Sequence, residues 1–211
     1  MMKHAWTTAR KVWGISTPPM NPFDYIELEK EAPARDRVLT KAEYAKLLES
    51  CTNSNLPPLL DAVKFAYLTG ARQGEQLRLK LEHVDFERRV LTFYDTKNGE
   101  DRTIPLSDTA FEILKRHRFG DTLFNILARR LRKHFNIACR RAAISNFRFH
   151  DLRACFITNA LLSGMSEATV AAISGHKDYR SMKRYTRIKA QDLIDDVNKI
   201  SAIREYKKIN S

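Results

Sequence analysis

Hydrophobic residues follow a helical period along most of this chain, but the period changes between residues 84 and 106. The short runs VDF, VLTFY and RTIPL in that block are rich in residues that favour strands. The last two runs flank DTKNGED, whose Asn98-Gly99 pair favours a tight hairpin turn. A parallel doubly wound fold would need strands alternating with helices along the whole chain. The pattern therefore predicts an α+β fold, mainly α-helical, with a small three-stranded antiparallel sheet.

Helices are expected before and after these strands in the sequence. Thr40 and Glu43 have the spacing of a capping box, and the helix that they open marks the start of a compact domain. Two prolines open a second helix that Gly70 closes, and RQGEQLRLK begins a third. Helical periodicity predicts further helices at residues 5–15, 107–118, 127–143, from about His150, at 166–174, at 178–186 and at 190–206.

The chain is strongly basic. It has 37 Lys and Arg against 25 Asp and Glu, a net charge of +12, which is typical of a protein whose partner is rich in phosphate. We therefore expect double-stranded DNA, or RNA, as the partner. No apolar run is long enough to cross a bilayer and the first residues resemble no signal peptide, so a cytoplasmic, nucleoid-associated protein without a membrane partner is expected. Cys51, Cys139 and Cys155 are far apart and predict neither a disulfide framework nor a metal site.

Two short motifs place arginines at the beginning of helices. In TGARQGEQL, Arg72 comes just after a glycine break, and Glu75 is placed to orient its guanidinium group. In HDLRACF, His150 and Arg153 are one turn apart and share a face. Taken alone, the first motif is equally compatible with an ordinary surface ion pair, and a single His-x-x-Arg motif is usually structural.

Three other residues complete a pattern along the chain. His176 follows a glycine at a predicted helix end, Tyr185 lies nine residues later, and Lys97 lies at the predicted hairpin turn. In order, Arg72, Lys97, His150, Arg153, His176 and Tyr185 resemble the catalytic residues of tyrosine recombinases of the phage integrase family. The resemblance covers about residues 38–188 and is carried by TGARQGE, the hairpin TKNGEDRTIPL, HDLR, GH and the tyrosine. Ser174 departs from the family's frequent leucine before GH, and Arg187 from its frequent histidine after the tyrosine.

The resemblance implies a domain organisation and partners. Residues 1–37 would be the last helix of a core-binding domain with its linker, 38–189 the catalytic domain, and 190–211 a C-terminal helix that docks on a neighbouring protomer. It also implies a monomer when free, a homotetramer on paired DNA sites, and accessory DNA-bending proteins. We further expect direct DNA contacts from Arg102, Lys177, Lys183, Arg184 and Arg187.

The candidate residues have a coherent chemistry. Two arginines, Arg72 and Arg153, suit the negative charge that builds on a phosphodiester during displacement, so no metal or other cofactor is expected. Tyr185 would attack the phosphate, with Lys97 as the acid for the leaving hydroxyl. His150 is the candidate proton acceptor and His176 a donor to a phosphate oxygen. The resemblance implies a link to the DNA 3′-phosphate.

Three other functions compete with a site-specific recombinase. A type IB topoisomerase would use the same chemistry to relax supercoils. A truncated DNA-binding regulator would occupy recombination sites without completing exchange. A metal-free nuclease that uses His150 and His176 would form no covalent adduct.

Overall fold

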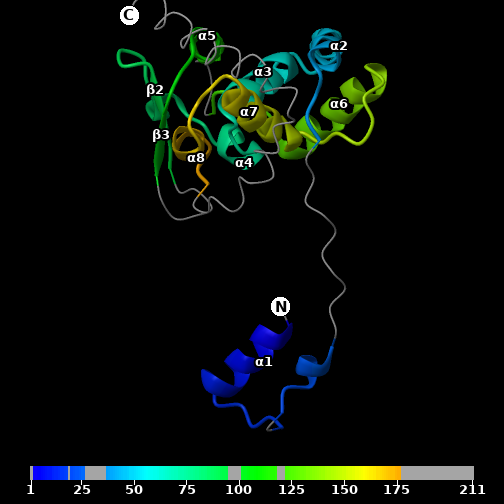
Figure 1. Cartoon of the computed structure of the whole chain (residues 1–211), viewed down its shortest axis with the longest axis vertical. Helices are drawn as coiled ribbons and strands as arrows, with labels where there is room; N and C mark the ends of the chain where they lie inside the picture. Colours follow the sequence, from blue (N-terminus) through cyan, green and yellow to red (C-terminus); the bar gives the residue numbers. More distant parts are fainter. Residues whose placement is uncertain (1, 19, 27–36, 95–100, 118–121, 177–211) are drawn as a thin grey trace, which may run out of the picture. The chain divides into compact units, whose positions relative to one another are not determined.

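The computed structural model describes residues 2–18, 20–26, 37–94, 101–117 and 122–176. The chain divides into two compact units, Met1–Ala34 and Arg35–Ser211 (Figure 1). The predicted hairpin turn and the predicted helices at 178–186 and 190–206 lie outside the described residues. No helix in the described part of the chain is long and apolar enough to cross a membrane.

The first unit contains one helix and one short 3-10 turn. Helix α1 spans Met2–Lys11, so it begins and ends earlier than the predicted 5–15. It ends early because Gly14 adopts a left-handed φ of 64°, which turns the chain out of the helical path. The turn η1 spans Pro22–Tyr25, and the side chain of Asn21 caps it by accepting a hydrogen bond from the Phe23 N–H.

The second unit is mainly helical, as predicted. Thr40 and Glu43 form the expected capping box at the start of α2. The helices of this unit are α2 (Lys41–Thr52), α3 (Leu59–Thr69), α4 (Gln73–Leu77), the 3-10 turn η2 (Leu81–His83), α5 (Asp108–Arg116), α6 (Ala128–Arg141), α7 (Asp151–Leu162) and α8 (Glu167–Ser174).

The predicted sheet is confirmed. Strands β1 (Val84–Asp85), β2 (Val90–Phe93) and β3 (Arg102–Pro105) pair antiparallel in the order β1-β2-β3. Leu91 pairs with Ile104, and Phe93 pairs with Arg102. These four side chains are all buried, and their face of the sheet therefore points into the protein.

Helices α3 and α7 pack along each other at the centre of the second unit (Figure 1). Phe65 on α3 and Leu152 on α7 are fully buried, and Phe135 on α6 contacts the rings of Phe147 and Phe149. The three cysteines are unpaired and buried, and they belong to the core. Burial raises the pKa of all three thiols, that of Cys139 to about 11.

Gly70 connects this core to the loop that carries Arg72. It ends α3 in the left-handed conformation, with a φ of 63°. The Phe156 ring packs directly against it, since a Cβ atom at this position would lie 2.5 Å from the Phe156 Cδ1 atom. Both the backbone angle and the space therefore require glycine.

We predict that Gly70→Ala lowers the free energy of unfolding by about 1–3 kcal/mol, because a left-handed alanine is strained and its methyl group displaces Phe156. Urea unfolding measures the change. Gly74→Ala is the matched control, since Gly74 lies in α4 with a normal φ and open space around the added atom. The control should be neutral or slightly stabilising. Equal losses in both variants would contradict this account of Gly70.

Candidate active site

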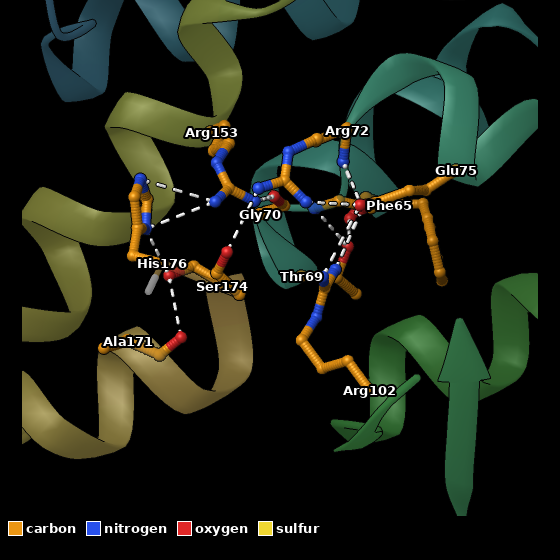
Figure 2. Close-up of polar contacts among 12 residues, drawn as sticks. Phe65, Thr69, Gly70, Arg72, Glu75, Arg102, Arg153, Ala171, Ser174 and His176 are labelled. Atoms are coloured by element: carbon orange, nitrogen blue, oxygen red, sulfur yellow. Dashed lines mark hydrogen bonds and ion pairs between the residues drawn. The ribbon is translucent and has the colours of Figure 1, made fainter. Parts of the chain in front are cut away.

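Arg72 is placed by a short loop between two helices. The Thr69 hydroxyl donates to the Phe65 carbonyl at 2.7 Å and accepts from the Ala71 N–H at 3.3 Å, which shapes the loop. Arg72 then forms the N-cap of α4. Its Nη1 donates to Glu75 Oε1 at 2.5 Å, and its Nη2 donates to the Gly175 carbonyl at 3.1 Å (Figure 2). The contact expected between Arg72 and Glu75 is present.

Glu75 is a buried carboxylate shared by two arginines. Besides the Arg72 side chain, it accepts hydrogen bonds from the Arg72 backbone N–H at 3.0 Å and from Arg102 Nη2 at 2.9 Å. Burial by itself would raise the pKa of Glu75, but the hydrogen bonds and charges of the two arginines outweigh burial and lower it. Glu75 is therefore ionised at neutral pH.

Arg102 is buried, whereas the sequence analysis expects it at the surface in contact with DNA. Its side chain is only 8% exposed. The guanidinium group stacks on Phe93, 4.6 Å from the ring centre, and packs against Gly175, where an added Cβ would lie 2.3 Å from Nη1. Because Glu75, Phe93 and Gly175 occupy this group, Arg102 supports the site from inside and does not offer a cation to DNA at the surface.

Arg153 and His176 meet across two helices. Arg153 is buried on α7, and its Nη1 donates to the Gly70 carbonyl at 2.8 Å. Its Nη2 lies 3.2 Å from Nδ1 and 3.4 Å from Nε2 of His176 (Figure 2). His176 follows Gly175, which ends α8 with a φ of 74°. The Ser174 hydroxyl lies 2.8 Å from His176 Nδ1.

His150 is the N-cap of α7 and is exposed to solvent. Partial desolvation, followed by the positive charges of Arg153 and Arg72, lowers the pKa of its imidazole. A neutral ring at physiological pH can accept a proton.

The structure thus brings Arg72, Arg153 and His176 together, with Glu75 and Arg102 behind them and His150 beside them. The remaining predicted site residues lie outside the described part of the chain: Lys97, Lys177, Lys183, Arg184, Tyr185 and Arg187. Within the described ranges, no group of His, Cys, Asp or Glu side chains could hold a metal ion.

The basic face of helix α6 is a feature that the sequence interpretation missed, although the helix itself was predicted at residues 127–143. It exposes six basic side chains, carries no acidic residue, and begins beside the site, since Gln73 Nε2 donates to the Ala128 carbonyl at 3.5 Å. The signal was visible in the sequence as the charge run ARRLRKHFNIACRR. The exposed residues are Arg129, Arg130, Arg132, Lys133, Arg140 and Arg141.

Known proteins are similar to this chain in both sequence and fold. The model of the phage integrase family matches residues 37–192. A shufflon-specific DNA recombinase from Escherichia coli is 32% identical over 201 residues, which cover 94% of this chain and 52% of that protein. The catalytic domain of bacteriophage HP1 integrase superimposes with a TM-score of 0.63 at 29% identity, covering 76% of this chain and 93% of that domain. A lambda integrase dimer bound to a COC′ core site superimposes with a TM-score of 0.69 at 21% identity, covering 87% of this chain and 56% of that one, and this similarity supports the fold alone.

A mainly helical fold with one small sheet and a cluster of arginine and histidine side chains defines a tyrosine recombinase type of catalytic domain. The chain belongs to the phage integrase family. It spans about half the length of the curated relatives it matches.

We predict that Glu75→Gln lowers the free energy of unfolding by roughly 3 kcal/mol at pH 7, since the buried Arg102 and the half-buried Arg72 lose their carboxylate partner. The pKa of Glu75 in the folded protein is below its unfolded value of about 4.3. The stabilisation by the charged carboxylate is therefore present above that pH and is lost as the pH falls through the lower, folded pKa. Urea unfolding at several pH values should show the gap between wild type and variant closing in acid.

Glu49→Gln is the control for this measurement, because Glu49 is exposed on α2. It should have little effect at any pH. A gap for Glu75→Gln that stayed constant from pH 7 into acid would show that the charge of Glu75 does not stabilise the fold.

Proposed function

We propose that this chain is the catalytic part of a site-specific DNA recombinase that cleaves and rejoins strands through a 3′-phosphotyrosyl intermediate. One observation carries the proposal: Arg72, Arg153 and His176 converge from three separate segments, and each is fixed by contacts with residues distant in sequence. Membership of the phage integrase family and the similarity to a shufflon-specific DNA recombinase support the same activity.

The two arginines match the charge that develops on the phosphate. Displacement at a phosphodiester increases the negative charge on the non-bridging oxygens, and donors that are already oriented stabilise it best. Arg72 is held by Glu75 and the Gly175 carbonyl, and Arg153 by the Gly70 carbonyl. Little reorganisation is then needed when the phosphate binds.

The proton transfers are assigned to the other predicted residues. Tyr185 attacks the phosphorus, Lys97 protonates the departing 5′-oxygen, and His150, whose pKa is lowered, accepts a proton. His176 contacts a phosphate oxygen. One phosphodiester replaces another, so rejoining needs neither a metal ion nor ATP.

Double-stranded DNA is the proposed partner. The net charge of +12 and the exposed basic residues of α6, a helix that begins beside the site, provide contacts for the phosphate backbone. Lys177, Lys183, Arg184 and Arg187 are proposed to add contacts around Tyr185. The same proposal includes a free monomer in the cytoplasm that assembles as a homotetramer on paired sites at the nucleoid, aided by DNA-bending proteins.

The domain limits also belong to the proposal. Residues 1–37 would be the end of a core-binding domain and its linker, 38–189 the catalytic domain, and 190–211 the segment that docks on a neighbouring protomer. The family match over residues 37–192 supports the middle limits.

We predict that the wild-type chain forms a covalent adduct with a nicked suicide duplex and that Tyr185→Phe abolishes the adduct, because only the attacking oxygen is removed. Denaturing gels detect the adduct, and a binding assay should show nearly unchanged duplex affinity. Tyr179→Phe is the control and should still form the adduct. Adduct formation by Tyr185→Phe would assign the nucleophile elsewhere, and binding by wild type with no adduct would favour a DNA-binding regulator.

We predict that Lys97→Ala cleaves ordinary DNA about 10²- to 10⁴-fold more slowly, as is typical when a general acid is lost. An alkoxide leaving group has a conjugate-acid pKa of about 15.7, whereas that of a thiolate is roughly 8.5, so sulfur at the bridging 5′ position hardly needs an acid. The cleavage rate of Lys97→Ala on this sulfur substrate should therefore recover most of the wild-type value.

Arg153→Ala provides the comparison on the sulfur substrate. It should remain slow there, because its role is to stabilise charge on the non-bridging oxygens. Equal rates for the two variants on both substrates would exclude Lys97 as the acid.

A further inference from the structure

Ser174 is a buried hydroxyl that the catalytic scheme does not use. It is the last residue of α8 and is fully buried. Its Oγ lies 2.6 Å from the Val170 carbonyl oxygen, 3.5 Å from the Ala171 carbonyl oxygen and 2.8 Å from His176 Nδ1 (Figure 2). The hydroxyl thus lies between the backbone of its own helix and the imidazole ring of the site.

A count of hydrogens fixes the direction of these contacts. A serine hydroxyl has one hydrogen, and a carbonyl oxygen can only accept. Two oxygens 2.6 Å apart repel each other unless a hydrogen lies between them, so the hydroxyl donates to Val170, four residues earlier, as helical serines commonly do. The contact with His176 then needs a hydrogen from the ring, and Nδ1–H must be the donor.

Arg153 lies close to both nitrogens of the ring, since its Nη2 is 3.2 Å from Nδ1 and 3.4 Å from Nε2. Arginine is a donor without any acceptor, and these two distances do not separate the tautomers, so the direction rests on the contact with Ser174. Among the described residues, the other charged groups near this turn are Arg72, which donates to the Gly175 carbonyl, and Arg102, which packs against Gly175, with Glu75 between them.

We propose that Ser174 is a positioning residue that holds His176 as the Nδ1–H tautomer and leaves Nε2 to exchange a proton with the DNA. The tautomer follows from the structure alone, whereas the role of Nε2 at the scissile phosphate rests on the proposed function. A neutral Nε2 is an acceptor, so His176 donates to a phosphate oxygen only after it has taken up a proton. Leucine, which the family pattern often has at this position, offers no hydroxyl for this bond.

The tautomer is measured directly by NMR of the DNA-free chain labelled with ¹⁵N-histidine. The chain has six histidines, and the signal lost in His176→Gln identifies the ring of interest. At a pH where that ring is neutral, Nδ1 should show the shift of a protonated nitrogen and Nε2 that of an unprotonated one. Ser174→Ala should move the ring towards the Nε2–H form that a free histidine side chain favours. A wild-type ring already in the Nε2–H form would overturn the proposal.

Cleavage of the nicked suicide duplex at saturating DNA tests the consequence for the site. Ser174→Ala should cleave roughly 10-fold or more slowly, as is typical when a bond that orients a histidine is lost, with unchanged duplex affinity. Ser174→Thr keeps the hydroxyl and should restore the rate. Ser163→Ala is the matched control, because the hydroxyl of Ser163, the C-cap of α7, also donates to a helix carbonyl, that of Ala160 at 2.8 Å, and the described residues give it no histidine contact.

The outcomes separate this proposal from the proposed function. A wild-type cleavage rate in Ser174→Ala would show that the hydroxyl does not position His176 for the reaction. If the wild-type chain forms no adduct, the recombinase proposal fails, while the NMR result still decides the tautomer. The wild-type spectrum decides it even if a Ser174 variant does not fold.

Discussion

The carboxylate of Glu75 is the group on which the arrangement of the site depends. It is 3% exposed, and burial of a charge is unfavourable unless partners compensate for the lost water. Arg72 on one side and Arg102 on the other supply that compensation. The three groups join the start of α4 to the start of β3, and Arg102 in turn packs against Gly175 at the end of α8. A single buried charge therefore links a helix, a strand and the turn that leads to His176.

Backbone carbonyls of two left-handed glycines hold the two arginines that face the proposed phosphate. Gly70 accepts from Arg153, 83 residues away in the sequence, and Gly175 accepts from Arg72, 103 residues away. A carbonyl orients a guanidinium group without adding a negative charge. Arg72 also pairs with Glu75, but that single carboxylate is shared with Arg102, so the two arginines keep a net positive charge for an anionic ligand. Both glycines lie against large side chains, Phe156 and Arg102, which explains why the site tolerates no larger residue there.

Much of the fold could be predicted because its signals are local. The capping box of Thr40 and Glu43, the contact of Arg72 with Glu75 and the three strands all depend on residues a few positions apart. The end of α1 was less predictable, because a single glycine conformation ends the helix before its apolar pattern stops. Arg102 was misplaced because an arginine beside a predicted turn looks solvated, and only its distant partners make burial favourable.

The sequence by itself determined the helical character, the single small sheet, the family pattern and the identity of the candidate catalytic residues. The period of each element is enough for the helices and the sheet, and the resemblance to the family adds the candidate catalytic residues. Only the tertiary structure decided that Arg102 lies inside the site, that Gly175 must leave room for it, and that the Ser174 hydroxyl meets the ring of His176. Gly70 meets Arg153, and Glu75 meets Arg102, because of how the helices and strands pack. The direction of the Ser174 hydrogen bond depends on interatomic distances, which residue spacing in the sequence does not contain.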